Sequence, residues 1–136
     1  MKRQKSRETA MELLFSMELS KNSVEETIEM FIEDEENKVK SVDMNYIKKV
    51  VTSVSGNIDK IDEIIEQSIE NWKKDRVSKV NLTILRLAIG EILFMEDVPG
   101  RVAINEAIEL TKKYSDEKSK SFINWALDKA LKIIEK

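Results

Sequence analysis

The stretch Lys79-Val-Asn-Leu-Thr-Ile-Leu-Arg-Leu-Ala-Ile-Gly-Glu-Ile-Leu-Phe-Met95 is the most apolar part of the sequence. Its apolar residues recur at helical spacing and surround most of the helix circumference, a pattern typical of a helix that is buried on all sides. Ser78 stands directly before the stretch, where an N-cap residue belongs. We therefore expect a helix over about 79–95 at the centre of a helical bundle.

Amphipathic segments flank this central helix on both sides, and each predicts a further helix. In chain order we expect a helix over about 4–19, a short helix after the capping box of Ser23 and Glu26, a helix capped by Asp43 that ends at 55–57, a helix from Asn57 or Asp59 to about Trp72, the central helix, one opened by Pro99, and a last one from Asp116 to about 134. Residues 34–42 are polar and predict a loop. The expected fold is all-α: a single compact domain of about seven helices over residues 1–136, with a short basic N-terminal arm at 1–7.

The composition limits the chemistry that this chain can perform. It contains no histidine and no cysteine, which excludes thiol nucleophiles, Ser-His and Cys-His catalytic pairs, and the common zinc sites. Three glycines and one proline leave no glycine-rich phosphate loop. Glu106 and Glu109 could form an acid–base pair, but no nucleophile motif accompanies them. We expect no enzyme activity, no cofactor and no metal.

The sequence also favours a cytoplasmic protein. It has no run of 18 apolar residues, so no segment is expected to span a membrane. The start is basic, but Glu8, Glu12 and Glu18 interrupt the apolar run that a signal peptide would need. The lack of cysteine agrees with a reducing compartment.

The net charge of −3 hides a strong asymmetry along the chain. Residues 1–7 contain four basic side chains and no acid, whereas residues 8–36 contain ten acids and a single lysine. A basic arm beside an acidic segment is a candidate contact for nucleic acid. The alternative is a solvated chain end without a ligand, because short basic N-termini are common.

Two aromatic residues lie close to positive charge. In the first expected helix, a helical wheel places Arg7, Met11 and Phe15 in a second stripe beside the main apolar face. In the last, Lys118 and Lys120 precede Phe122 near the helix start, where backbone N–H groups attract phosphate. Single-stranded RNA binding uses this combination, since bases stack on rings while cations hold phosphates. The alternative is that each ring packs against a neighbouring helix.

Two charged residues interrupt the apolar central helix. Arg86 and Glu91 must each find an ion-pair partner or an exposed edge, because an unpaired buried charge is very costly. We expect structural roles for both rather than catalytic ones.

Several stretches together resemble the NusB family of bacterial transcription antitermination factors. The most specific is Asp97-Val-Pro-Gly-Arg-Val-Ala-Ile-Asn-Glu-Ala-Ile-Glu-Leu-Thr-Lys112, close to the family pattern Pro-x-x-Val-Ala-Ile-Asn-Glu-Ala-Val-Glu-Leu-Ala-Lys. Residues 84–91 are similar to the family's Ile-Leu-Arg-Leu-Ala-x-x-Glu helix, and residues 122–128 are similar to Phe-Val-Asn-Gly-x-Leu-Asp. The start, Arg7-Glu8-x-Ala10 followed by Leu14-Phe15, resembles the family's arginine-rich beginning with its aromatic residue.

The resemblance covers nearly the whole chain and implies an all-helical RNA-binding protein without enzyme activity. Family members bind the boxA sequence of nascent RNA together with the ribosomal protein NusE. The assembly helps RNA polymerase to pass terminators, notably in ribosomal RNA operons. By resemblance, the RNA contacts would come from Arg3, Lys5, Arg7, Phe15, Lys118, Lys120 and Phe122. NusE would dock on the helical body.

Two departures from the family pattern bear on the site. Trp125 stands where the family usually has glycine, and lysine replaces arginine in part of the basic start, which keeps the charge but loses the planar fork. A homodimer stays open, because Met11, Phe15 and Trp125 could serve an interface instead of RNA. Two further hypotheses compete: a helical adaptor that binds protein without RNA contact, and an RNA-modifying enzyme, since a similar helical domain is fused to some RNA methyltransferases.

Overall fold

The computed structural model describes residues 2–70 and 73–135, and nearly all of them are helical. The helices in chain order are α1 (Lys2–Ser20), α2 (Val24–Asp34), α3 (Glu36–Ser41), α4 (Met44–Gly56), α5 (Ile58–Ser68), the 3-10 helix η1 (Lys74–Arg76), α6 (Lys79–Phe94), α7 (Gly100–Tyr114) and α8 (Glu117–Glu135). No strand occurs among the described residues, which confirms the all-α prediction. The expected helix end near Trp72 lies outside the described residues.

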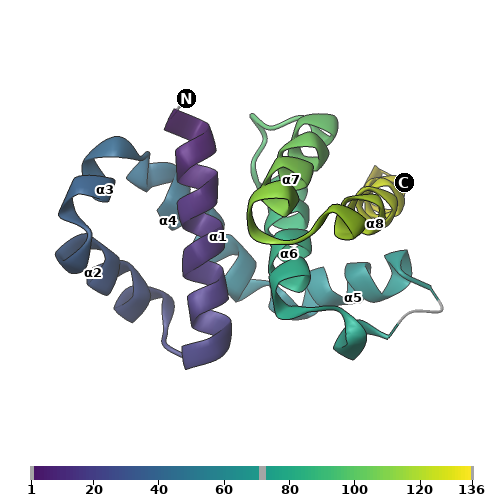
Figure 1. The fold of residues 1–136 in the computed structure, drawn as a ribbon, viewed down its shortest axis with the longest axis horizontal. Helices are drawn as coiled ribbons and strands as arrows, with labels where there is room; N and C mark the ends of the chain where they lie inside the picture. Colours follow the sequence, from purple (N-terminus) through teal and green to yellow (C-terminus); the bar gives the residue numbers. More distant parts are fainter. Residues whose placement is uncertain (1, 71–72, 136) are drawn as a thin grey trace.

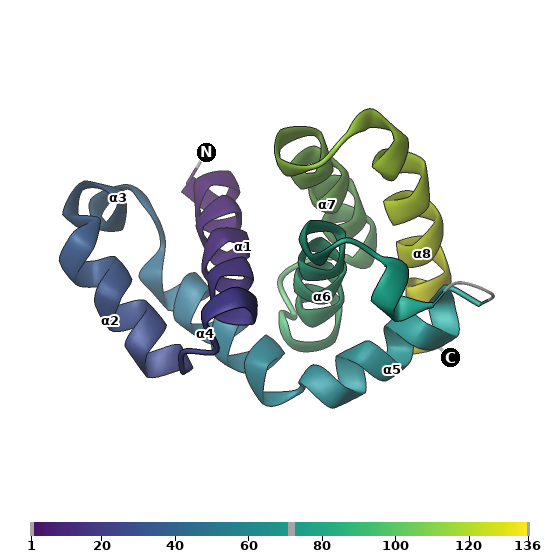
Figure 2. The same cartoon turned by 60° about the horizontal axis from the view of Figure 1, so that its bottom comes forward.

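The α6 helix lies at the centre of the molecule, as its all-round apolar sequence predicts. It contacts α1 and α4 on one side and α5, α7 and α8 on the other. Figure 1 shows α1–α4 grouped on the left and α5, α7 and α8 on the right, and Figure 2 shows α5 running beneath the bundle. Helix α6 therefore joins two groups of helices into one core.

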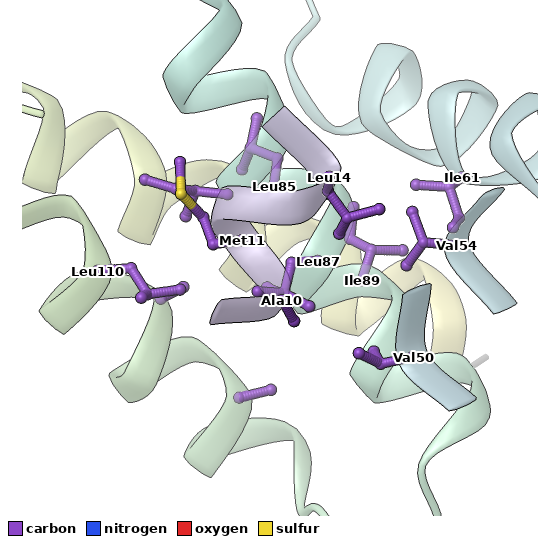
Figure 3. Close-up of a cluster of buried hydrophobic side chains, with 14 of the residues drawn as sticks. Ala10, Met11, Leu14, Val50, Val54, Ile61, Leu85, Leu87, Ile89 and Leu110 are labelled. Carbon is purple, nitrogen blue, oxygen red and sulfur yellow. The ribbon is translucent and has the colours of Figure 1, made fainter. Parts of the chain in front are cut away.

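The core is built from side chains that meet between these two groups. Figure 3 shows Ala10, Met11 and Leu14 of α1 pointing toward residues of α4, α6 and α7. Met11 is only 2% exposed, so it belongs to the core and not to the outer stripe that the helical wheel predicted. The close approach of α6 to α4 needs Gly90, because a Cβ atom there would overlap a methyl carbon of Val54.

Most helix starts lie where the sequence predicts them, because the capping side chains make the expected hydrogen bonds. The Ser23 hydroxyl accepts the Glu26 N–H while the Glu26 carboxylate accepts the Ser23 N–H, which completes the capping box. Asp43 accepts from Tyr46 at 3.1 Å in the same way. Pro99 is the N-cap residue of α7 and not part of its first turn.

The predicted loop at 34–42 is wrong, because α3 occupies most of it and brings the number of described α-helices to eight. Helix α3 buries none of its residues. Peripheral and local contacts hold it instead: Val39 packs against the edge of the core, and Glu36 pairs with Lys40 at 3.9 Å in an i,i+4 arrangement. The acid in the first turn and the lysines in the last turn also oppose the helix dipole.

The basic N-terminus does not form a separate arm, because α1 begins at Lys2. Ser6 and Arg7 are both buried. The Ser6 hydroxyl accepts the Asp43 N–H at 2.8 Å, which ties α1 to the start of α4. The first turns of α1 are thus part of the helical bundle.

Candidate nucleic-acid interface

Arg7 is a buried structural residue, which corrects its expected role as an RNA contact. Its guanidinium lies between α1 and α6, with a side chain that is 5% exposed. Its Nε donates to both carboxylate oxygens of Glu91, at 2.8 and 3.1 Å, and its Nη2 donates to Oε2 at 2.8 Å. Glu106 of α7 adds a third charge at 3.5 Å. No face of this guanidinium is left for a phosphate.

The pair of Arg7 and Glu91 keeps its charge inside the protein. Burial lowers the pKa of Arg7, but the hydrogen bonds and the charge of Glu91 outweigh this, so the net pKa is raised. The geometry is the bidentate one that makes arginine–carboxylate pairs strong and specific in orientation. Its consequence is that α1, α6 and α7 are held in one fixed arrangement.

Arg3 and Lys5 lie at the start of α1, and their positive charges differ in how available they are to a ligand. The Arg3 guanidinium lies 4.4 Å from the centroid of the Tyr46 ring and 3.4 Å from the Asp97 carboxylate. Its side chain is 33% exposed, so it is partly available to a ligand. Lys5 is exposed, and among the described residues it forms no ion pair. This end of α1 therefore offers less free positive charge than the sequence predicted.

Phe15 is half-buried against the core and lies between two sets of contacts that join α1 to other helices. On one side, Glu12 accepts a hydrogen bond from the Tyr114 hydroxyl at the end of α7. On the other side, Glu18 lies 3.8 Å from Lys79 at the start of α6. These contacts direct the Phe15 stripe toward the corner where α7 ends and α6 begins. Phe15 is separated from Arg3 by roughly 18 Å along α1, at about 1.5 Å per residue.

Asn81 ties three helix ends together at that corner. Its side-chain N–H₂ donates to the Ser119 hydroxyl of α8 at 2.9 Å, and its Oδ1 accepts from Ser115 at the end of α7 at 2.8 Å. Its backbone N–H donates to the N-cap Ser78 at 3.1 Å. The starts of α6 and α8 are therefore fixed close together, and their first turns are capped by Ser78 and Asp116.

A pocket of about 330 Å³ lies at this corner, next to the starts of α6 and α8. Arg76, Lys118 and Phe122 line it with two cations and a ring. Arg76 and Lys118 are exposed, and within the described part of the chain neither forms an ion pair. The acid of the pocket, Asp116, accepts the N–H of Ser119 at 2.8 Å, and hydrogen bonds from Ser119 lower its pKa. The pocket therefore combines free positive charge with an aromatic surface.

Lys120 is less available than Lys118, because it pairs with Glu117 at 2.8 Å and its side chain is 29% exposed. Lys118 and Phe122 both line the pocket, whereas Lys120, two positions from each of them along α8, does not. Phe15 faces the same corner, whereas Arg3 and Lys5 lie at the far end of α1.

Arg86, which is half-buried, makes the structural ion pairs that the sequence predicts. Arg86 donates to both carboxylate oxygens of Asp62 at 2.8 Å and to Glu18 at 2.8 Å. Lys74 adds a further contact to Asp62 at 3.1 Å. The hydrogen bond from Arg86 is the main reason that the pKa of Glu18 is lowered. This network links α1, α5 and α6 at the surface.

The carboxylates that suggested acid–base chemistry are engaged elsewhere. Glu106 faces Arg7, and Glu109 accepts from Lys112 at 3.0 Å. Among the described residues, no three metal-ligating side chains gather in one place. Within the same residues, no helix combines the length and the apolar character needed to cross a bilayer. The pocket with Arg76, Lys118 and Phe122 is instead suited to binding an anionic, aromatic ligand.

Sequence reasoning missed Arg76 and Asn81 as parts of this surface. Arg76 belongs to the cluster Lys73-Lys74-Asp75-Arg76, which ends two residues before the N-cap Ser78, and that position near a helix start was the available signal. No pattern in the sequence predicts the bridge from Asn81 to Ser119, because the two residues are 38 positions apart.

Comparison with known proteins places the chain among helical transcription factors. The sequence profile of the NusB family matches residues 4–132. The transcription antitermination protein NusB of Clostridium botulinum (strain Alaska E43 / Type E3) is 57% identical over 132 residues, which cover 97% of this chain and 99% of that protein. The NusB protein of Clostridium perfringens (strain SM101 / Type A) is 50% identical over 135 residues, covering 99% of this chain and 100% of that protein. A chain in the crystal structure of the antitermination factors NusB and NusE in complex with double-stranded RNA matches with a TM-score of 0.82 at 28% identity, covering 96% of each chain.

Proposed function

This chain belongs to the NusB family, and we propose that it is an RNA-binding transcription antitermination factor. It binds boxA-type single-stranded RNA together with the ribosomal protein NusE. The assembly acts in the cytoplasm and helps RNA polymerase to pass terminators in ribosomal RNA operons. The protein performs no catalytic step and serves to hold RNA and protein together.

The observation that carries this proposal is the pocket at the starts of α6 and α8. Arg76 and Lys118 line this pocket and supply charge for phosphates. Phe122 supplies a ring on which an unpaired base can stack. The combination is that of proteins that bind single-stranded nucleic acid.

The proposed RNA surface extends from this pocket along α1. Its members are Phe15, Lys118, Lys120 and Phe122 near the pocket, and Arg3 and Lys5 at the far end of α1. Arg7 is left out, because its buried guanidinium is saturated by Glu91. Arg76 takes its place as a phosphate contact.

The relatives support RNA and NusE as partners. The matching solved structure contains NusB with NusE and double-stranded RNA, and 28% identity over 96% of this chain makes it a close structural guide. Weak RNA binding by the chain alone is expected, because part of its basic start is lysine or is held by internal contacts. NusE then raises the affinity by adding contacts to the same RNA.

The test is a fluorescence titration of labelled boxA-type RNA with the full chain, with and without NusE, against an RNA of scrambled sequence. The double variant Arg76→Gln/Lys118→Gln should weaken binding and reduce the log–log salt slope by about 1.4, since each phosphate neutralised by a cation accounts for roughly 0.7. The matched control is Lys48→Gln/Lys49→Gln on α4, which removes the same charge from the other group of helices. It should leave the slope close to that of the parent.

The alternative function, an adaptor that binds protein only, predicts a different result. NusE would bind the chain, but no RNA would bind to either the chain or the complex. That outcome would overturn the proposed function.

A further inference from the structure

Four residues form a stripe along the outer face of α8. Lys118, Phe122, Trp125 and Lys129 stand at helical spacings of four, three and four, so they share one side of the helix. The opposite side, with Ile123, Leu127 and Ala130, is buried in the core. The stripe therefore presents, in chain order, a cation, two rings and a second cation along the edge of the buried face.

The two rings of the stripe contact each other. The centroids of Phe122 and Trp125 lie 6.1 Å apart, with the ring planes tilted by 41°. This separation lies within the range of favourable aromatic pairs. Both side chains are half-buried, so each ring is held by packing and still reaches the surface. The two rings are therefore held in place before RNA binds, so binding costs little side-chain entropy.

Lys129 closes the stripe at its C-terminal end. Its ammonium group lies 5.4 Å from the centroid of the Trp125 ring, within cation–π range, and 3.3 Å from Glu70. The lysine side chain is 39% exposed and the glutamate is 66% exposed. An ion pair this exposed is weak and exchanges readily with a phosphate.

The stripe continues the pocket at the start of α8 without a break. Phe122 lines the pocket with Lys118 and Arg76, and its ring also contacts Trp125. From Lys118 to Lys129 the stripe spans roughly 16 Å at about 1.5 Å per residue. Stacked bases of one strand rise about 3.4 Å each, so this length accommodates more than one nucleotide.

From these contacts we propose that Phe122 and Trp125 form a two-ring stacking platform that carries the bound RNA from the pocket along α8 toward Lys129. Trp125 is thus an RNA-contacting residue, and Lys129 holds a phosphate beyond it. This inference rests on the proposed function and names the path of its ligand. Pairing the stripe with a second copy of itself about a two-fold axis would set lysine against lysine, which disfavours a dimer on this face.

The experiment uses the full chain, boxA-type RNA and NusE, with affinity measured over a series of salt concentrations. Trp125→Ala should weaken RNA binding roughly 5- to 150-fold, the effect of removing one stacking ring, with little change in the salt slope. Trp125→Phe should restore most of the affinity. Lys129→Gln should instead reduce the salt slope by about 0.7, because it removes a phosphate contact.

A second measurement needs no removal of the ring. In a Trp72→Phe background Trp125 is the only tryptophan of the chain, so its fluorescence reports on the platform directly. Adding the RNA should quench or shift this fluorescence in proportion to binding. The controls are Phe94→Ala, which removes a half-buried ring at the other end of α6, and Lys48→Gln. Both should bind RNA like the parent.

The outcomes separate the two proposals. If the parent binds RNA while Trp125→Ala binds equally well and the Trp125 fluorescence does not respond, the platform is overturned and the proposed function stands. If Trp125→Ala changes the sedimentation of the free protein but not RNA affinity, the ring belongs to a protein interface and the platform is again overturned. If neither the parent nor its complex with NusE binds RNA, the proposed function fails and the platform fails with it.

Discussion

The start of α1 and the start of α8 both carry clustered positive charge, but the protein uses the two clusters differently. At the start of α1, Arg7 is buried against Glu91 and Arg3 rests on Tyr46. At the corner of α6 and α8, Arg76 and Lys118 stay exposed and, within the described residues, unpaired. A count of charges therefore overstates the positive charge that the first region offers to a ligand and understates the charge that the second region offers. What a cation can bind depends on the partners that the fold gives it.

The largest expected effect concerns the buried pair of Arg7 and Glu91. Arg7→Ala should lower the free energy of unfolding by about 3–5 kcal/mol, because it leaves Glu91 buried without its partner. Removing both charges, as in Arg7→Met/Glu91→Leu, should lower the free energy of unfolding less than either single change does, because no unpaired charge then stays buried. Chemical denaturation of Arg7→Ala, Arg7→Met, Glu91→Leu and the double variant measures this.

The control for that experiment is Lys112→Ala, which removes an exposed pair with Glu109. Its stability should stay near that of the parent, because exposed pairs contribute little. A parent-like stability for Arg7→Ala would contradict the structural role given to Arg7.

The next largest effect concerns the exposed corner where α6 and α8 begin, because a half-buried ring can be removed there while the core stays packed. Phe122→Ala should weaken RNA binding by about 1–3 kcal/mol, the contribution of one stacked base. Its thermal stability should fall much less than that of Arg7→Ala, because the ring is only half-buried. RNA titration and thermal melting of the same preparation give both values. A loss of stability without a loss of affinity would remove Phe122 from the interface.

A third prediction uses pH to test the network around Arg86. Arg86 holds the pKa of Glu18 below its ordinary value of 4.5, and hydrogen bonds from Arg86 outweigh burial to hold that of Asp62 below 3.8. A lowered carboxylate pKa gives stability that is present in full above the ordinary value and is lost as pH falls through the folded value. The stability of the parent should therefore drop as pH falls below about 4.5, and Arg86→Leu should show a shallower drop. Melting curves between pH 3 and pH 7 test this, and parallel curves for the two proteins would refute it.

The smallest expected effect comes from the free lysine at the start of α1. Lys5→Gln should change RNA affinity only a few-fold and reduce the salt slope by at most about 0.7, since it supplies at most one phosphate contact. Its melting temperature should not change, because Lys5 is exposed. If Lys5→Gln weakened RNA binding more than Lys118→Gln does, the ranking of the two regions would be reversed.

The parts of the fold that the sequence predicts are those set by local chemistry. The all-round apolar pattern of 79–95 predicts the central helix, and Ser23, Asp43 and Ser78 mark helix starts because a cap acts within one turn. Helix α3 was missed because it buries nothing, so no apolar periodicity marks it. Its ends could have been recognised only from weak i,i+4 and dipole effects.

The candidate site was predicted only in part, because its decisive contacts join residues far apart in the chain. The sequence indicates Phe15, Lys118 and Phe122 as rings and cations at helical spacing. It does not indicate that Arg7 meets Glu91 across 84 positions, or that Asn81 holds α8 beside α6. Such contacts depend on how the helices pack, which composition and periodicity leave open.

The comparison of the two regions is tested most directly by Arg7→Met and Lys118→Gln, measured side by side. Each folded variant is titrated with boxA-type RNA and NusE over a series of salt concentrations, and its melting temperature is measured. Lys118→Gln should reduce the salt slope by about 0.7 with an unchanged melting temperature, whereas Arg7→Met should lower the melting temperature and leave the slope as it is. The opposite result, a reduced slope for Arg7→Met and a parent-like slope for Lys118→Gln, would contradict this account.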